Sequence, residues 1–181
     1  MGKERASFDL SEHKKRKYGN SELNYITGTE YRKKYKKIIK TIDGVIRYWE
    51  NKSGGEEKNP FVGVVLFGSW LRGIDVHSKS DIDIWLVRRG REYGDGDESD
   101  FIDDLKKRGL SDVSWGMLSF SILDDFDNLS CDVHDSVLED GFKLITPYKW
   151  VEKEFERAKG PEGKAIADAY QKKLEENYSE W

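Results

Sequence analysis

Apolar positions along this chain follow two periods, and each period predicts a different kind of element. From about Thr29, aromatic and aliphatic residues recur at steps of three and four, which places them on one face of a helix. This face consists of Tyr31, Tyr35, Ile38, Ile42, Val45 and Trp49. Residues 51–60 include two adjacent glycines and are expected to form the loop that ends this helix, whereas residues 1–27 are expected to be irregular.

Three strands are predicted after this helix. Residues 61–67, FVGVVLF, form a short apolar run rich in β-branched residues, which favours a buried strand. Residues 81–87, DIDIWLV, alternate between polar and apolar positions and predict a second strand. A short helical segment is expected to open at Gly68 between these strands, and residues 112–122 predict a third strand.

The remaining elements are predicted to be helical, apart from one short extended segment. Helices are expected at residues 99–108, 130–140, 147–158 and 162–178, and the extended segment at residues 142–145. This mixture of helices and strands predicts an α/β or α+β fold with a small mixed sheet. We expect a flexible basic N-terminal segment at residues 1–28, a central domain at residues 29–146, and C-terminal helices at residues 147–181 that pack on the domain or extend it.

Charge is distributed unevenly between the two parts of the chain. Residues 1–60 contain 15 Lys and Arg against 9 Asp and Glu, whereas residues 61–181 contain 16 against 26. The net charge of the whole chain is −4. The basic first part is expected either to meet an anionic partner or to be a solvated helix surface, and the acidic remainder disfavours extensive tracking along nucleic acid.

Composition excludes several classes of protein. No apolar run approaches the ~20 residues that cross a bilayer, and no apolar stretch follows the N-terminal residues as it does in a signal peptide. Cys131 is the only cysteine, which excludes an internal disulfide and a cysteine-rich zinc site. We therefore expect a cytoplasmic protein without a membrane partner.

Residues with a chemical use gather around the first two predicted strands. Gly68 and Ser69 follow the buried strand at the start of a helical segment, where free backbone N–H groups favour a phosphate. Asp81 and Asp83 lie at alternate positions of the next strand, so both project from one face. Two adjacent carboxylates repel each other unless a cation lies between them, and Mg²⁺ or Mn²⁺ suits oxygen ligands and phosphates. The arrangement therefore predicts a metal-dependent nucleotide site.

This stretch resembles the polymerase-beta-like nucleotidyltransferase superfamily, whose pattern is an apolar strand, Gly-Ser, a short spacer and Asp-x-Asp. The matching residues are Phe67-Gly68-Ser69, Arg72-Gly73 and Ser80-Asp81-Ile82-Asp83. The minimal nucleotidyltransferases are the most similar branch, and residues 133–145 resemble their closing helix, glycine and final short strand. The resemblance is sharp over residues 62–87, looser up to about residue 146, and absent from both ends of the chain.

The resemblance implies a role for each of these residues. Gly68 and Ser69 would hold the phosphates of an NTP, and Asp81 and Asp83 would bind the metal ions. The resemblance also implies a third carboxylate on the following strand, as a metal ligand or as a base for the acceptor hydroxyl.

Asp112 is our choice for that third carboxylate, because it lies at the start of the predicted third strand. If the register of this strand shifts by two residues, Ser114 takes the place and the site lacks a third carboxylate. Asp124 and Asp125 lie too far along the strand to take part.

Several neighbouring residues have two interpretations. Arg72 either contacts a phosphate or forms an ion pair at the surface. Trp70 is a candidate for stacking on a base, and Trp85, which shares the strand face of the two aspartates, is a candidate wall of the site. His77 and Lys79 lie in the loop before the aspartates, where a solvated surface is the plainer interpretation.

These features predict an enzyme that moves a nucleoside monophosphate from an NTP to a hydroxyl, with AMP from ATP as the first choice. The resemblance implies a tyrosine of a HEPN-type toxin as the acceptor, which would make this chain an antitoxin; small molecules and RNA 3′ ends are the alternatives. A second hypothesis is a catalytically silent module of the same fold that binds an NTP or a partner. A third is a nucleic-acid-binding protein that uses Lys14–Lys17 and the lysine-rich helix.

Overall fold

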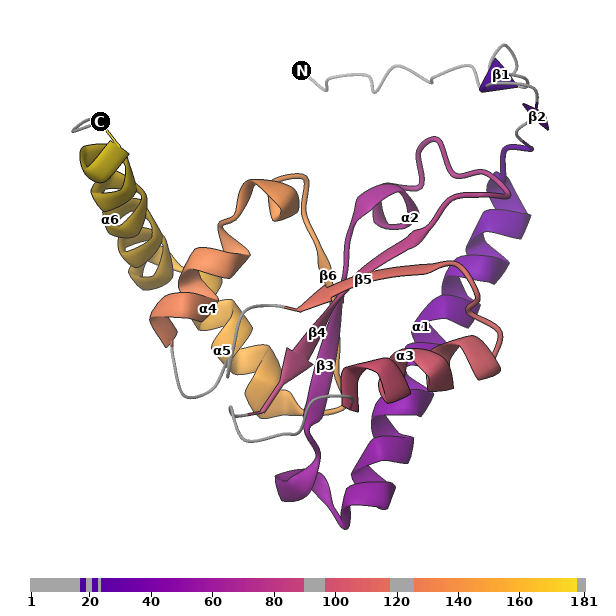
Figure 1. Ribbon diagram of the computed structural model, residues 1–181, viewed down its shortest axis with the longest axis horizontal. Helices are drawn as coiled ribbons and strands as arrows, with labels where there is room; N and C mark the ends of the chain where they lie inside the picture. The colour runs from indigo at the N-terminus through magenta and orange to yellow at the C-terminus, as the bar shows by residue number, and fades with distance from the viewer. Residues whose placement is uncertain (1–16, 19–20, 23, 90–96, 118–125, 179–181) are drawn as a thin grey trace, which may run out of the picture.

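The computed structural model describes residues 17–18, 21–22, 24–89, 97–117 and 126–178 of the chain. In these residues it shows a mixed α+β fold around a four-stranded sheet with the order β5-β4-β3-β6 (Figure 1). The strands are β3 (Phe61–Leu66), β4 (Ile82–Arg88), β5 (Val113–Met117) and β6 (Lys143–Ile145). β3 runs antiparallel to β4 and β6, whereas β4 and β5 run parallel, so the sheet is mixed as the sequence predicts.

Two helices pack together beside β3 and supply much of the hydrophobic core. They are α1 (Gly28–Ser53) and α3 (Asp97–Lys107), and they contact each other. The rings of Trp49, Phe61 and Phe101 meet between them with centroid distances of 4.5 to 6.2 Å. Because α3 connects β4 to β5, it provides the crossover that parallel neighbours need.

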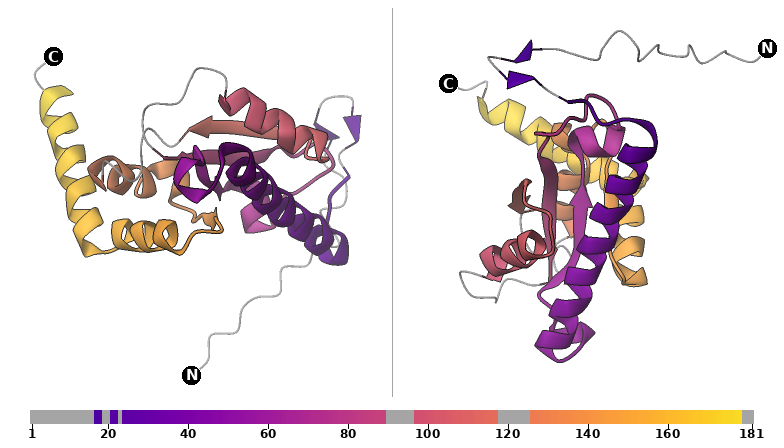
Figure 2. Two further views of the ribbon diagram at one scale, coloured as in Figure 1. Left: turned by 90° about the horizontal axis from the view of Figure 1, so that it is seen from below. Right: turned by 90° about the vertical axis from the view of Figure 1, so that its right-hand side faces the viewer.

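A second group of helices lies at the end of the molecule opposite α1 (Figures 1 and 2). It consists of α4 (Phe126–Val133), α5 (Lys149–Lys159) and α6 (Pro161–Tyr178), which pack on one another. Val151, Phe155 and Ala158 of α5 belong to the same hydrophobic core as the sheet. No helix in the described part of the chain has the length and apolar character to cross a membrane.

The helix expected at residues 130–140 is wrong in its bounds. α4 ends at Val133, and a short 3₁₀ helix, η2 (Ser136–Leu138), follows it. The Asp135 carboxylate accepts a hydrogen bond from the backbone N–H of Val137 at 2.7 Å. Such a local side-chain bond gives the backbone an alternative to a continuing helix, and the sequence pattern of apolar residues does not register it.

The segment before α1 is more ordered than the irregular region that the sequence predicts. Lys17–Tyr18 (β1) and Ser21–Glu22 (β2) pair as a short hairpin. Ile26 then donates its N–H to the Val76 carbonyl at 2.7 Å, and Ser78 donates to the Asn24 carbonyl at 2.9 Å. This segment therefore holds the loop that leads into β4.

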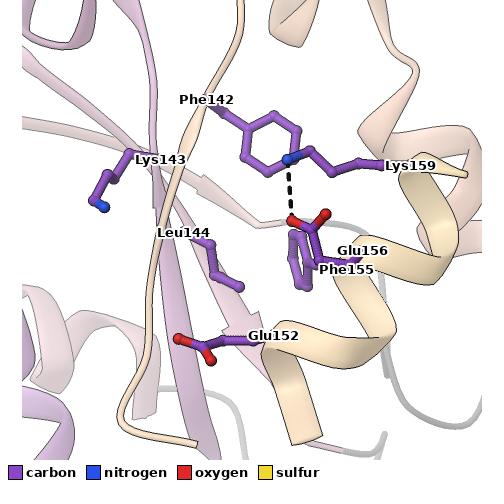
Figure 3. Close-up of a pocket in the computed structure, with 7 residues that line it drawn as sticks. All are labelled: Phe142, Lys143, Leu144, Glu152, Phe155, Glu156 and Lys159. Carbon is purple, nitrogen blue, oxygen red and sulfur yellow. Dashed lines mark hydrogen bonds and ion pairs between the residues drawn. The ribbon is translucent and has the colours of Figure 1, made fainter. Parts of the chain in front are cut away.

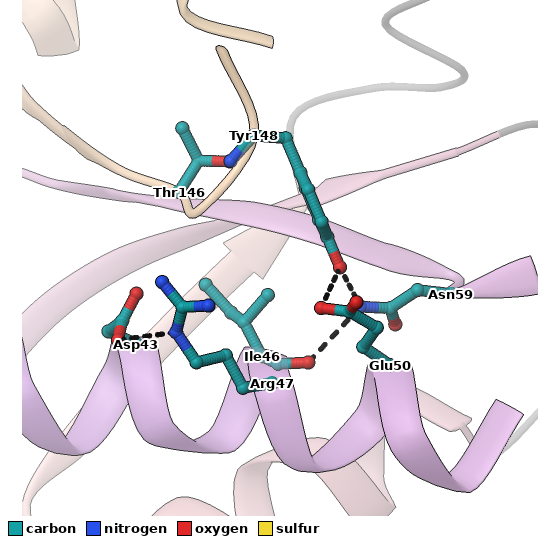
Figure 4. A network of polar contacts seen from close by, with 7 residues as sticks. All are labelled: Asp43, Ile46, Arg47, Glu50, Asn59, Thr146 and Tyr148. Carbon is teal, nitrogen blue, oxygen red and sulfur yellow. Dashed lines mark hydrogen bonds and ion pairs between the residues drawn. The ribbon is translucent and has the colours of Figure 1, made fainter. Parts of the chain in front are cut away.

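A buried polar network joins α1 to the residues that precede β3 and α5 (Figure 4). Asn59 follows the 3₁₀ helix η1 (Glu56–Lys58) and is fully buried. Its amide nitrogen donates to the Ile46 carbonyl at 3.1 Å and to the Tyr148 hydroxyl at 3.0 Å, and its oxygen accepts from the Phe61 N–H at 3.1 Å. The Tyr148 hydroxyl donates in turn to Glu50 at 3.0 Å. All of these buried polar groups are therefore satisfied.

Candidate functional site

The turn between β3 and α2 (Gly68–Arg72) brings the chain backbone directly against the carboxylate of Asp83. Gly68 has a φ of 71°, in the left-handed region that favours glycine. A Cβ atom at this position would collide with Oδ2 of Asp83 and would lie 3.1 Å from its Cγ. The backbone also connects the two elements, because the Phe67 N–H donates to the Asp83 carbonyl at 3.1 Å. Conformation and space therefore both favour glycine at position 68.

Asp83 carries the perturbed carboxylate of the site. Partial burial raises its pKa, the nearby Asp81 carboxylate raises it further, and the Arg72 guanidinium acts in the opposite direction. Asp83 is half-buried and Asp81 is exposed, so the pair lies at the mouth of the turn rather than in the core. The two carboxylates predicted from the sequence are therefore close enough to repel each other.

The register between β4 and β5 decides which residue stands beside Asp83. The pairs Ile82–Val113, Asp83–Ser114 and Ile84–Trp115 align the strands. Ser114 therefore lies next to Asp83 on the same face of the sheet, at the position where the resemblance implies a third carboxylate.

Asp112, the predicted third carboxylate, precedes β5 and is exposed. Its carboxylate accepts a hydrogen bond from the Ser111 hydroxyl at 3.2 Å, and its backbone carbonyl accepts from the Ile82 N–H at 2.7 Å. Across the residues described, no three His, Cys, Asp or Glu side chains form a group that could hold a metal ion. The structure thus brings Asp81 and Asp83 together but does not gather Asp112 with them. Asp124 and Asp125 lie outside the described residues.

The two aspartates nevertheless suit a magnesium ion. Mg²⁺ is commonly held by one or two carboxylates, with water and substrate phosphates as its remaining ligands. The mutual repulsion that contributes to the raised pKa of Asp83 is the kind of interaction that a divalent cation removes. Asp81 and Asp83 are therefore the residues that would hold such an ion.

Ser69 and Arg72 lie on α2, beside the carboxylates. α2 has only five residues, so its helix dipole is short, and any phosphate would depend on individual backbone N–H groups and on the half-buried Ser69. Arg72 forms an ion pair with Asp140 at 3.1 Å, and both side chains are largely exposed. Of the two interpretations of Arg72, the structure therefore shows the ion pair, although the guanidinium is also near enough to lower the pKa of Asp83.

The two candidate tryptophans have different surroundings. Trp70 is buried, and its indole N–H donates to the Ser80 carbonyl at 3.3 Å, so this ring braces the turn instead of lining an open site. Trp85 is half-buried on the face of Asp83, and its ring meets that of Phe67 edge-on with centroids 5.2 Å apart. Trp85 and Phe67 therefore remain candidates for an aromatic wall.

A residue that sequence reasoning missed as part of the site is Tyr31 on α1. Its hydroxyl donates to the Trp70 carbonyl at 2.6 Å, and the two rings stack with centroids 6.0 Å apart. Since Trp70 in turn contacts Ser80, the contacts form a chain from α1 through α2 to the residue before Asp81. Tyr31 was visible in the sequence only as one member of an apolar helix face.

The loop that carries His77 and Lys79 is held by the N-terminal segment. The Tyr25 ring meets the His77 ring edge-on at 6.0 Å, and the imidazole Nδ1 accepts a hydrogen bond from the Lys79 N–H at 3.2 Å. The Ser80 hydroxyl accepts from the His77 N–H at 2.9 Å. His77 therefore stabilises the loop by local contacts.

A separate pocket of about 340 Å³ lies between β6 and α5 (Figure 3). It is lined by Phe142, Lys143, Leu144, Glu152, Phe155, Glu156 and Lys159. Lys159 pairs with Glu156 at 3.4 Å and lies 4.9 Å from the centre of the Phe142 ring. Because its lysines and glutamates are equal in number, this pocket has no excess charge that would select an anion or a cation.

The distinctive chemistry therefore lies at Gly68, Asp81 and Asp83, where one carboxylate of a repelling pair lies against a turn that favours glycine. Comparison of the chain with protein-family models, curated proteins and solved structures finds no match. The interpretation of the site thus depends on these residues and their geometry.

Proposed function

We propose that this protein is a metal-dependent nucleotidyltransferase that moves a nucleoside monophosphate from an NTP to a hydroxyl group. The observation that carries the proposal is the Asp81–Asp83 pair, whose inner carboxylate lies against the side-chain-free turn at Gly68. A structural role alone would not require two repelling carboxylates next to this backbone turn. ATP, as the donor of AMP, is our first choice for the nucleotide.

The residues of the site have separate tasks in this proposal. Gly68 lets the Asp83 carboxylate lie against the backbone, and Ser69 would offer an N–H and a hydroxyl to phosphate oxygens. Asp81 and Asp83 would hold Mg²⁺ or Mn²⁺, which when bound neutralises phosphate charge and polarises the reacting phosphoryl group. Trp85 and Phe67 form the apolar wall on the same face of β4.

The bond changes of the reaction are those of in-line displacement at phosphorus. The acceptor oxygen would form a bond to the α-phosphorus while the bond from that phosphorus to pyrophosphate breaks. The proton of the acceptor hydroxyl would pass to a base; the sequence predicts Asp112 for this role, although the structure does not gather Asp112 with Asp81 and Asp83. A HEPN-type toxin with a tyrosine acceptor follows from the family resemblance, with small molecules and RNA 3′ ends as alternatives.

The test is to incubate the purified protein with each α-labelled NTP and Mg²⁺, alone and with lysate of its source, and to separate the products on a gel. We expect a labelled protein, RNA or small molecule that is absent with Asp81→Asn and with Asp83→Asn. The loss should be at least about 10³-fold, because metal coordination contributes several kcal/mol.

The matched control is Asp75→Asn, which removes the same charge from the loop that precedes β4. Asp75 is exposed and has a φ of 56°, which asparagine tolerates. This variant should transfer label like the wild type. Full activity of Asp83→Asn would disprove the metal-dependent assignment.

One observation favours a second candidate, a catalytically silent NTP-binding module. Ser114, not a carboxylate, is paired with Asp83 in the sheet. A silent module would bind an NTP in the presence of Mg²⁺ without forming any product. In that case Ser114→Asp, which adds a carboxylate beside Asp83, is the variant in which transfer should appear.

A further inference from the structure

The outer face of α1 carries a row of lysines without ion-pair partners in the described part of the chain. We call this row the basic stripe; its members are Lys33, Lys36, Lys37 and Lys40, and all four are exposed. Their spacing of three and four residues places them on one side of the helix. From this surface and its neighbours, we propose that α1 binds a single-stranded nucleic acid.

The absence of ion-pair partners distinguishes the stripe from Lys34 and Arg47, two other exposed basic residues of α1. Lys34 pairs with Glu30 at 3.0 Å, and Arg47 pairs with Asp43 at 3.0 Å. The four stripe lysines form no such pair with any described residue, so their charges add along the helix. The stripe covers about 10 Å from Lys33 to Lys40 at about 1.5 Å per residue, which is the length of roughly three phosphates along one strand.

An exposed aromatic ring continues the same face of the helix. Tyr48 is 41% exposed, and the guanidinium of Arg108 lies 5.0 Å from the centre of its ring. Gly44 lies between Lys40 and Tyr48 on this face, and a Cβ atom added there would have no neighbour within 4 Å. The basic stripe is therefore followed on the same face by the uncrowded Gly44 and then by the Tyr48 ring, which contacts the Arg108 guanidinium.

This combination fits a nucleic acid better than an acidic protein. Lysines that track a backbone, followed by an aromatic ring on which a base can stack, are the parts that single-strand-binding proteins use. An acidic peptide would use the lysines but would have no need of the Tyr48 ring. The contribution of Tyr48 therefore separates the two kinds of partner.

The neighbouring helix α3 adds to the stripe at its middle. The Lys37 ammonium reaches the turn after α3, where it would lie 3.1 Å from a Cβ at Gly109. Arg108, which holds Tyr48, precedes that glycine. The surface is therefore built from two helices that the core fixes relative to each other.

The test is fluorescence anisotropy of a short labelled oligouridylate, titrated with the full chain at several salt concentrations and without NTP. The stripe variant replaces Lys33, Lys36, Lys37 and Lys40 with Gln. We expect it to bind at least about tenfold more weakly at low salt, with a salt slope reduced by about 0.7 for each phosphate that a lysine no longer neutralises. Tyr48→Ala should weaken binding by about tenfold, as expected for one stacked base, and Tyr48→Phe should restore it.

A matched control variant replaces four exposed lysines of α5 and α6 with Gln. These are Lys149, Lys153, Lys172 and Lys173. It has the same net charge as the stripe variant and should bind like the wild type. Every substituted side chain in both variants is exposed, so both are expected to fold.

Two results would overturn the proposal. One is an equal weakening of binding in the stripe variant and the control, because binding would then follow net charge alone. The other is unchanged binding by Tyr48→Ala together with full competition by polyglutamate, which would indicate an acidic protein partner. Asp83→Asn should bind the oligonucleotide like the wild type, so this result is independent of the proposed transferase activity.

Discussion

The network at Asn59 and the site at Asp83 treat polar groups in opposite ways. Asn59 is fully buried, and its amide contacts a backbone carbonyl, a hydroxyl and a backbone N–H (Figure 4). Asp83 is only half-buried, yet within the described residues its carboxylate accepts no hydrogen bond. Burial and the Asp81 carboxylate both raise its pKa. The polar groups at Asn59 therefore have hydrogen-bond partners, whereas the Asp83 carboxylate has none among the described residues.

Under the proposed function, the satisfied network serves the fold, whereas the carboxylate pair serves a ligand. A satisfied buried group stabilises one conformation, and removing a partner costs the desolvation of what remains. A repelling carboxylate pair lowers the stability of the free protein, and such perturbed groups cluster at functional sites. Variants in either region separate these two roles when activity and stability are measured in the same protein.

Gly68→Ala should have the largest effect, because it lowers both the transfer activity and the stability of the protein. The left-handed conformation costs about 1–2 kcal/mol for a residue with a Cβ, and the new methyl group must push Asp83 away. A displacement of about 1 Å in a reacting group reduces turnover by about 10²-fold. Label transfer and thermal melting of the variant measure the two effects.

Gly54→Ala is the matched control for backbone strain. Gly54 also has a positive φ, 86°, but a Cβ there would meet only Lys58 Cδ at 4.0 Å. This variant should lose a similar amount of stability and keep full transfer activity. If Gly68→Ala keeps its activity as well, the close approach to Asp83 has no functional role.

Asn59→Ala should destabilise the fold without changing the chemistry. It leaves the buried Phe61 N–H without its partner and removes the bonds to the Ile46 carbonyl and the Tyr148 hydroxyl, at a cost of about 2 kcal/mol. Denaturant unfolding measures the loss, and exposed Asn51→Ala is the control that should change little. A neutral result for Asn59→Ala would mean that the network does not stabilise the chain.

Tyr148→Phe should have a smaller effect, about 1 kcal/mol, since one hydroxyl is lost from the network. Burial is the main cause that raises the pKa of Tyr148 from 10.0 to about 12; the Glu50 carboxylate also raises it, and the hydrogen bond from Asn59 lowers it. Because folding raises this pKa, the neutral hydroxyl contributes its full stability below pH 10 and loses it as the pH rises toward 12.

Unfolding experiments across this alkaline range provide the measurement. The wild type should lose stability faster than Tyr148→Phe between pH 10 and pH 12, so that the two curves converge. Parallel curves would show that Tyr148 does not ionise with a raised pKa.

The sequence predicted the strands and helices that flank the site more accurately than it predicted the contacts between them. The apolar run before Gly68 and the alternation after Asp81 determine β3 and β4 because side-chain period and burial are local properties. The sequence predicted both aspartates on this strand; the structure begins β4 at Ile82, so Asp83 lies on the strand and Asp81 immediately before it.

The partner of Asp83 on β5 could not be predicted in the same way. A shift of the strand by two residues keeps the same faces buried, so the sequence left Asp112 and Ser114 both open. The structure pairs Ser114 with Asp83. The Tyr31–Trp70 contact likewise joins residues 39 positions apart and leaves no local pattern.

The most direct test of the central claim is thermal melting of wild type and Asp83→Asn at neutral pH, first with EDTA and then with Mg²⁺ and ATP. Because folding raises the pKa of Asp83 above 3.8, its ionised form opposes folding at neutral pH, and Asn at this position should melt at or above the wild-type temperature in EDTA. Saturating Mg²⁺ and ATP should then raise the melting temperature of the wild type alone, by about 5–10 °C. A lower melting temperature of Asp83→Asn in EDTA, or an equal shift of both proteins with Mg²⁺ and ATP, would contradict the account.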